Sequence, residues 1–215
     1  MLSLQTVILV TVLIFSVVVH EVAHAWQARR EGDDTADRLG RITLNPLPHL
    51  DLFGSVIVPL LLASQGGIIF GWAKPVPVNP ANYREYVAGD IRVSLAGIVS
   101  NLGLAVLATL LAGVVLRVTG GSGFSSPIFM ALDYAIFINL ILAFFNLIPI
   151  PPLDGSHVVA HALPAELAER YRDLGRYGLF IVMAFVFLAP GALNLLLSPV
   201  YFLQGLADQF IRLWI

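Results

Sequence analysis

The stretch VVVHEVAHAW, from Val17 to Trp26, combines a membrane-like setting with titratable side chains. It ends an apolar run that begins at Leu2, yet it contains two histidines and one glutamate. As a helix of about 25 residues, Leu2 to Trp26 is long enough to cross roughly 30 Å of hydrocarbon. An ionisable side chain inside such a helix costs about 2.5–3.5 kcal/mol on insertion scales and usually has a function. The stretch therefore predicts a membrane helix that carries a functional site.

The composition of the whole chain supports a membrane protein. Its 215 residues are 58% hydrophobic and 12% charged, with a mean hydropathy of +0.84. Soluble domains carry about 25% charged residues, so the chain lies outside that class. The formal net charge is −2 and no basic tail is present, which argues against nucleic acid as a partner. Cysteine is absent, which excludes disulfides and thiolate metal sites.

Further apolar runs indicate several membrane segments. They cover residues 52–70, 91–118, 128–148, 177–197 and, more weakly, 200–215. We predict an all-α polytopic membrane protein, a bundle of about five or six transmembrane or re-entrant helices with a short extended or β segment near 71–80. We expect a single membrane-embedded domain over 1–215, with a catalytic core at about 1–160 and C-terminal helices at about 177–215.

His20 and His24 are four residues apart, so in a helix they share one face. Two imidazoles at this spacing can take adjacent corners of a tetrahedral zinc site. Glu21 lies beside them, where a carboxylate can take a proton from an attacking water. The pattern H-E-x-x-H alone is moderately specific, but metal coordination would offset the cost of burying these groups in lipid. In the alternative, the histidines form hydrogen bonds between helices and Glu21 pairs with an arginine.

Asp154 is the best candidate for a third ligand, among alternatives that include His49, His157 and His161. It lies in NLIPIPPLDG (146–155), where prolines interrupt helical hydrogen bonding. Irregular backbone at membrane depth is tolerated where it is buried in protein or lines a wet cavity. Asp154 can also cap a helix that begins near Ser156. We expect His49 to be a loop or interfacial residue, and His157 and His161 to pack beside the site.

Basic residues predict the topology, because they are retained on the cytoplasmic side. Segments 28–51, 71–92 and 165–176 carry most of the basic residues and are predicted to be cytoplasmic. The uncharged, Gly/Ser-rich loop 119–126 is predicted to be external, and Arg117 beside it is the one basic residue that does not fit. Asp154 returns to the side of the histidines only if 52–70 makes no net crossing. We therefore predict that 52–70 makes a re-entrant or partial passage, as Pro59 and the pair Gly66-Gly67 suggest. If 52–70 does span, the stretch that follows must cross back.

The chain resembles the site-2 proteases, the intramembrane zinc metalloproteases of peptidase family M50. HEVAH (20–24) is similar to the zinc-binding helix of that family, and NLIPIPPLDG is similar to its N-x-x-P-x-P-x-L-D-G signature. GWAKPVPVN (71–79) and SLAGIVSN (94–101) also resemble family motifs, although Ile98 stands where proline is common. The resemblance is to the short prokaryotic form, which lacks PDZ and CBS domains.

The resemblance implies one Zn²⁺ per chain, held by His20, His24 and Asp154, with Glu21 as general base. It implies hydrolysis of peptide bonds within or near transmembrane segments of membrane proteins, as in regulated intramembrane proteolysis. Asn146 is a candidate donor to the oxyanion, with an interhelical hydrogen bond as the alternative.

The partners implied are a transmembrane protein substrate and the lipid bilayer, and the oligomeric state is not predicted. The location implied is the prokaryotic plasma membrane, crossed several times, with the active site toward the cytoplasm. The 71–80 segment can either capture an unwound substrate by β-addition or act as a connector. The alternative function is a non-proteolytic zinc protein, such as a metal transporter or scaffold. A transporter would need polar groups across the full membrane thickness, whereas here the acids and histidines cluster on one side.

Overall fold

The computed structural model describes residues 3–57 and 73–214, and within these ranges the protein is helical with no strand. Within these residues, three helices are long and apolar enough to cross a membrane. They are α1 (Leu4–Glu31), α4 (Tyr86–Val118) and α5 (Pro127–Asn146). The remaining helices are α2 (Thr35–Arg38), α6 (Gly155–Ala162), α7 (Ala165–Asp173), α8 (Gly178–Leu188) and α9 (Pro190–Arg212). The predicted all-α membrane bundle is therefore confirmed.

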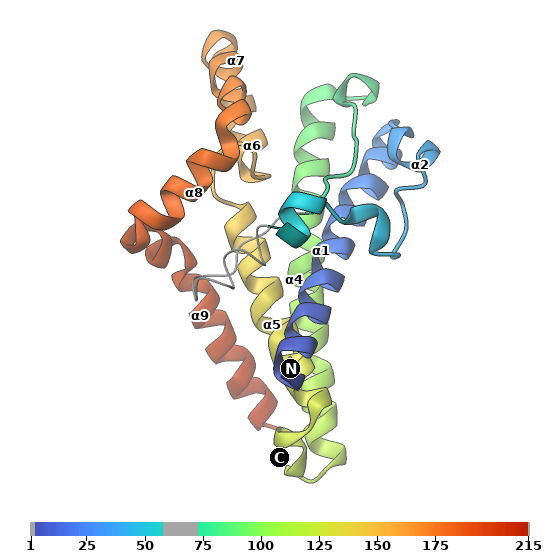
Figure 1. Cartoon of the computed structure of the whole chain (residues 1–215), viewed down its shortest axis with the longest axis vertical. Coiled ribbons are helices and arrows are strands. Elements are labelled where there is room, and N and C mark those ends of the chain that lie inside the picture. The colour runs from blue at the N-terminus through green and yellow to red at the C-terminus, as the bar shows by residue number, and fades with distance from the viewer. Residues whose placement is uncertain (1–2, 58–72, 215) are drawn as a thin grey trace.

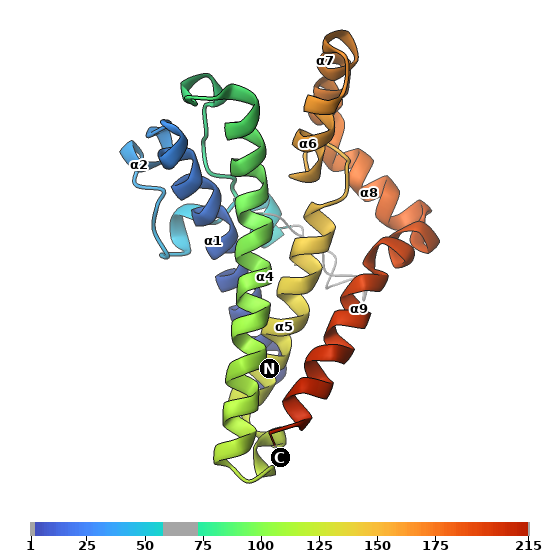
Figure 2. The ribbon, with the colours of Figure 1, turned by 180° about the vertical axis from the view of Figure 1, so that it is seen from behind.

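The three long helices pack side by side, with α4 running against α1 and α5 (Figures 1 and 2). Helix α1 begins at an N-cap, where the side chain of Ser3 accepts a hydrogen bond from the Thr6 N–H. It runs five residues beyond Trp26, to Glu31, and stops at Gly32. Gly32 has φ +117°, a left-handed conformation that glycine adopts without steric cost. The HEVAH motif (20–24) therefore lies in the interior of this helix.

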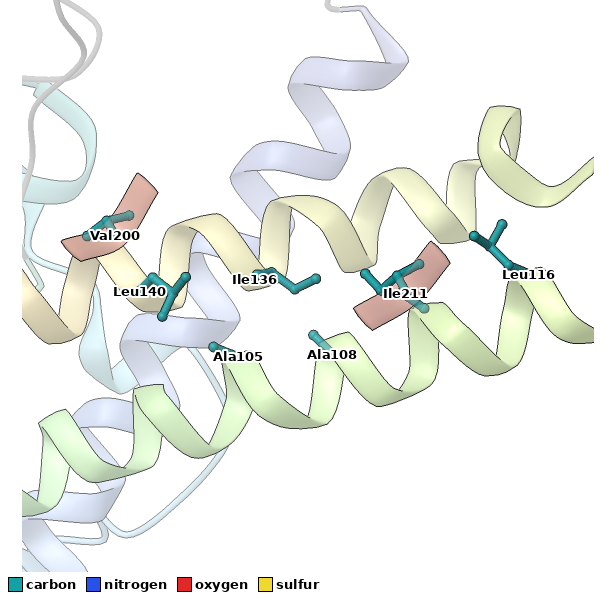
Figure 3. Packing of buried hydrophobic residues seen from close by; sticks show 8 residues of the cluster. Ala105, Ala108, Leu116, Ile136, Leu140, Val200 and Ile211 are labelled. Atoms are coloured by element: carbon teal, nitrogen blue, oxygen red, sulfur yellow. The ribbon is translucent and has the colours of Figure 1, made fainter. Parts of the chain in front are cut away.

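Small side chains allow α4 and α5 to approach closely. Ala105 and Ala108 of α4 face Ile136 and Leu140 of α5 in a buried apolar cluster, and Leu116 lies further along the same face (Figure 3). Small residues at helix contacts are typical of membrane bundles, where close packing replaces the hydrophobic effect as the source of helix association. This cluster forms the core of the bundle on the side away from α6 and α7.

The C-terminal part is bent rather than straight. The predicted span 177–197 is interrupted, because α8 ends at Leu188 and α9 begins at Pro190 after a bend of 91°. Proline lacks the N–H that a continuous helix would need and fits the first turn of a new one. Val200 and Ile211 of α9 then pack into the α4–α5 core (Figure 3). Residues 200–212 of the weakly apolar C-terminal segment thus return along the bundle as part of α9 (Figure 2).

The predicted β segment near 71–80 is absent among its described residues, 73–80. Prolines at 75 and 77 cannot donate hydrogen bonds to a neighbouring strand. Other backbone groups of this segment bind side chains and loops instead, as described below. Most of the predicted re-entrant passage 52–70 lies outside the described residues. Its first part, Leu52–Ile57, forms one π-helical turn.

Candidate metal centre

His20, His24 and Asp154 come together in the structure although 130 residues separate His24 from Asp154 in the chain. The Nε2 atoms of the two histidines are 3.0 Å apart. Oδ2 of Asp154 lies 3.2 Å from His20 Nε2 and 3.3 Å from His24 Nε2. Among the described residues, these three form the only group of three or more His, Asp or Glu side chains arranged to hold a metal ion.

The turn after α5 brings Asp154 to the histidines. Helix α5 ends at Asn146, and the proline-rich residues that follow form turns until α6 begins at Gly155. A Cβ atom at Gly155 would collide with the backbone carbonyl of Leu147. Only glycine therefore lets the start of α6 fold back this closely onto the end of α5. Asp154, the residue just before α6, makes no side-chain capping bond, so its carboxylate is free to face the histidines.

Hydrogen bonds fix the tautomer of both histidines. His24 Nδ1 lies 2.7 Å from the carbonyl oxygen of Val93, which can only accept. His20 Nδ1 lies 2.6 Å from Oδ1 of Asn101. The Asn101 amide nitrogen donates elsewhere, to Asn139, so its oxygen is also an acceptor. Both histidines must therefore carry a proton on Nδ1, and in a neutral imidazole this leaves a lone pair on Nε2.

The three converging atoms fit a zinc ion. Two Nε2 lone pairs and a carboxylate oxygen meet at 3.0–3.3 Å, and no described group donates a hydrogen bond to the buried Asp154 Oδ2. Such an arrangement of acceptors is repulsive unless a cation lies between them. Ligands about 2.0 Å from a tetrahedral ion are about 3.3 Å from one another. The nitrogen and carboxylate donors are those of catalytic zinc sites, which keep a fourth position open.

The electrostatics of Asp154 agree with an ionised ligand. Burial raises the pKa of a carboxyl group, but without a metal the two imidazoles beside Asp154, when protonated on Nε2, lower its pKa below the ordinary value. The carboxylate is therefore the form present at neutral pH. A metal ligand must be in this form.

A buried polar network holds His20 in place. The Asn101 amide donates to Asn139 Oδ1 at 2.7 Å, and the Asn139 amide donates to Ser16 Oγ at 2.9 Å. Asn101, Asn139 and Ser16 are each at most 1% exposed and come from α4, α5 and α1. The network therefore ties all three long helices to the ring of His20. Hydrogen bonds to the far nitrogen of a metal-binding histidine orient the ring and raise its basicity.

Replacing Asn101 with leucine is expected to lower zinc affinity by about 10- to 100-fold, the usual cost of losing such a partner. The His20 Nδ1–H would then be buried without an acceptor. Competition with a fluorescent zinc chelator would measure the affinity. Thr109→Val is the matched control, because Thr109 also lies on α4 and bonds only to its own helix, at Ala105 O. Equal affinities for the Asn101→Leu and Thr109→Val proteins would contradict this role.

Glu21 lies beside the histidines on α1 and contacts the segment that follows residue 72. Its Oε2 accepts a hydrogen bond of 2.8 Å from the Val76 N–H. The side chain of Asn146, the predicted oxyanion donor, instead donates to the carbonyl of Leu142 on its own helix, at 2.9 Å. No described contact joins Asn146 to the three converging atoms, and its contact with substrate stays a prediction.

The other histidines lie outside the cluster. His49 is buried in the loop before residue 50, and its Nε2 donates to the carbonyl of Thr43. His157 and His161 of α6 both contact Oδ2 of the buried Asp90 on α4, at 3.1 and 2.7 Å. The hydrogen bond to Asp90 raises the pKa of His157, although burial opposes the effect. This contact fastens α6, and with it the adjacent Asp154, against α4.

Two contacts at the site were not predicted from the sequence. Gly97 of α4 faces both imidazoles, and a Cβ atom there would lie 2.5 Å from His20 Cε1 and from His24 Nε2. Asn101, one turn further along α4, supports His20. Both lie in SLAGIVSN. An asparagine in an otherwise apolar span was the available signal, since polar residues at membrane depth usually face partners inside the protein.

Comparison with known proteins agrees with this geometry. The model of "Peptidase family M50" matches residues 111–190, which include Asp154. The chain is 39% identical over 192 residues to "Putative zinc metalloprotease YwhC" of Bacillus subtilis, covering 88% of this chain and 83% of that protein. It is 32% identical to "Putative zinc metalloprotease Rip2" of Mycolicibacterium smegmatis (84% and 66% covered). It is 30% identical to "Putative zinc metalloprotease Rip2" of Mycobacterium tuberculosis (92% and 73% covered). No solved structure gives a significant match.

The long apolar helices, the converging imidazoles and carboxylate, and the similarity over most of the chain lead to one assignment. The enzyme is a zinc metalloprotease of the membrane, and the chain belongs to peptidase family M50, the site-2 protease family.

Proposed function

We propose that the protein cuts transmembrane segments of other membrane proteins, with His20, His24 and Asp154 as the zinc ligands and Glu21 as general base. The observation that carries this proposal is the convergence of three ligand atoms within 4.8 Å of one another, two of them on α1, a helix of membrane-spanning length, and the third in the turn after α5. At 1.5 Å per residue, His24 and His20 lie roughly 10 and 16 Å before the end of α1 at Glu31. Hydrolysis at this depth acts on peptide bonds that lie in the bilayer.

Each side chain has a distinct task in this mechanism. When bound, Zn²⁺ supplies a Lewis acid that polarises the peptide carbonyl and lowers the pKa of water. His20 and His24 present Nε2 to the ion, because their Nδ1 atoms are committed to Asn101 and Val93. Glu21 takes the proton of the attacking water and delivers it to the leaving amine. The substrate helix must unwind first, since its carbonyls are otherwise hydrogen-bonded within the helix.

We also propose that the site opens toward the cytoplasm of the plasma membrane. The basic residues other than Arg117 and Arg212 lie in the last turn of α1, in α2, in the loops that lead into α4 and its first two turns, or in α7 and the turn after it. Arg117 and Arg212 lie at the opposite end, next to the 119–126 loop. This asymmetry is the one that the positive-inside rule predicts for a cytoplasmic α6–α7 end.

The test is cleavage of a single-span substrate by the purified enzyme in lipid vesicles. We expect mass spectrometry to locate the cut inside the apolar span, in the half nearer the substrate's basic, cytoplasmic flank. Removing zinc with a chelator should abolish cleavage, and added Zn²⁺ should restore it. A soluble peptide of the same scissile sequence is the control and should be cut far more slowly. Cleavage confined to the soluble peptide, or unaffected by zinc removal, would overturn the proposal.

A further inference from the structure

Arg41 is a buried cation without a carboxylate partner among the described residues. It is 8% exposed and lies in the loop between α2 and the short turn at Leu47–His49. Its Nη2 donates to the carbonyls of Lys74 and Pro75, at 2.9 and 3.2 Å, and its Nε has no hydrogen-bond partner. Buried arginines are normally paired with an acid. The arginine therefore acts on the backbone of the 74–76 segment rather than on a side chain.

The same backbone reaches Glu21. The Pro75 carbonyl that accepts from Arg41 and the Val76 N–H that donates to Glu21 Oε2 belong to one peptide group. Two hydrogen bonds therefore connect Arg41 to Glu21 through one peptide group. The Arg41 guanidinium donates to the Pro75 carbonyl, and the N–H on the other side of the same amide donates to the Glu21 carboxylate. Hydrogen bonds in such a chain polarise and strengthen one another. The positive end lies on Arg41 and the negative end on Glu21, so the dipole of the peptide is aligned between them.

Other contacts hold this peptide group in place. The Lys74 N–H donates to the carbonyl of His49. On the other side, Asp33, which is fully buried, accepts from the Asn79 N–H and from the Asn82 amide. Burial raises the pKa of Asp33, but the hydrogen bond from the Thr35 hydroxyl, together with the bonds from Asn79 and Asn82, holds that pKa below its usual range. The segment is thus fastened before and after Val76, and the peptide group has one orientation to offer Glu21.

We propose that Arg41 is a positioning residue for peptide hydrolysis, holding the general base Glu21 through the Pro75–Val76 peptide group. The inference rests on the proposed function of Glu21. One carboxylate oxygen is engaged by Val76, which leaves the other to accept the proton of water. Without Arg41 the peptide plane can rotate, and Glu21 loses its fixed orientation. Arg41 does not contact His20, His24 or Asp154 in any described interaction, so zinc binding is independent of it.

The experiment compares Arg41→Met, Arg41→Lys and a control, Arg38→Met, in lipid vesicles. Arg38 is on α2, and its guanidinium is exposed and paired with Asp34. We expect Arg41→Met to lower kcat by about 10- to 100-fold, as for a misplaced catalytic group, with KM and bound zinc unchanged. Arg41→Lys should recover much of the loss, because an ammonium can donate to the same carbonyls. Arg38→Met should match the wild type.

A double-mutant cycle measured by thermal denaturation tests whether Arg41 positions Glu21 or only stabilises the loop that contains residues 74–76. If Arg41 acts on Glu21, the Tm losses of Arg41→Met and Glu21→Ala, which removes the acceptor for the Val76 N–H, should not add in the double variant. If Arg41 only braces the loop, they should add, and the inference fails. It also fails if Arg41→Met keeps the wild-type kcat. If Arg41→Met does not fold, Arg41→Gln decides, since it keeps a donor without the charge: an intermediate kcat supports the inference and a wild-type kcat overturns it.

The two proposals can fail separately. Full activity of zinc-loaded Glu21→Gln would remove Glu21 as the base and overturn the proposed mechanism, whatever Arg41 does. An inactive Glu21→Gln protein together with a fully active Arg41→Met protein would leave the mechanism standing and overturn only the role of Arg41.

Discussion

Replacement of Glu21 by glutamine is expected to stop peptide hydrolysis while zinc stays bound. An amide cannot take up the proton of water, so the reaction loses general-base catalysis, a contribution of about 10²- to 10⁴-fold. The fold should survive, because the amide oxygen of glutamine can still accept the hydrogen bond that Glu21 receives from Val76. Single-turnover cleavage of a transmembrane substrate, with bound zinc measured by mass spectrometry, would give both quantities on the same sample.

Two further variants sharpen this result. Glu21→Asp keeps the carboxylate but withdraws it by one methylene, so it should retain part of the activity. Glu166→Gln removes a carboxylate that is exposed on α7 and paired only with Arg170, and it should behave as the wild type. Wild-type cleavage by a zinc-loaded Glu21→Gln protein would contradict the assigned role.

Introducing a methyl group at Gly97 is expected to expel zinc. The added Cβ would lie 2.5 Å from atoms of both imidazoles, far inside van der Waals contact. The rings cannot turn away without breaking the hydrogen bonds from His20 to Asn101 and from His24 to Val93. We therefore expect Gly97→Ala to weaken zinc binding by more than about 100-fold, beyond the cost of losing one outer hydrogen bond. Cleavage should fall to background with it.

Gly103→Ala is the matched control for this variant. Gly103 lies on the same helix, and a Cβ there meets nothing within 4 Å. The change should leave zinc binding intact and, because alanine favours helix, should not lower Tm. Chelator competition and thermal denaturation of both variants would test the prediction. If Gly97→Ala bound zinc as tightly as Gly103→Ala, the close contact between α4 and the histidines could not be as described.

The sequence indicates the candidate site residues because each is a polar side chain in or directly after an apolar, membrane-like segment. His20, Glu21 and His24 interrupt an apolar run at helical spacing, and Asp154 follows a proline-rich break that ends a membrane span. Both patterns are local, so they can be recognised without knowing how the helices pack. The topology argument added that Asp154 and the histidines must lie at one depth, and in the structure they are in contact.

The contacts of α4 could not be predicted in the same way. This helix is apolar on nearly every side, so periodicity does not indicate which face meets α1. The contacts of Gly97 and Asn101 with the histidines depend on how α4 is rotated about its axis, which the sequence does not indicate. The contact between Arg41 and the Pro75 carbonyl joins two loops that are distant in the sequence, so no local pattern predicts it. The bend at Pro190 did have a local signal, a Pro-Gly pair inside the apolar run, and the prediction of one span over 177–197 passed over it.

Because His20 and His24 precede Asp154 by 134 and 130 positions, the ribosome makes the two imidazoles well before the carboxylate. A ribosome adding about 5–20 residues per second needs roughly 6 to 26 s to travel from His24 to Asp154. Throughout that interval the nascent chain already has its first helix in the bilayer but lacks a complete set of donors. With Asp154 as the proposed third ligand, a chain truncated before the turn at 147–154 lacks one zinc donor and is not expected to cleave neighbouring proteins.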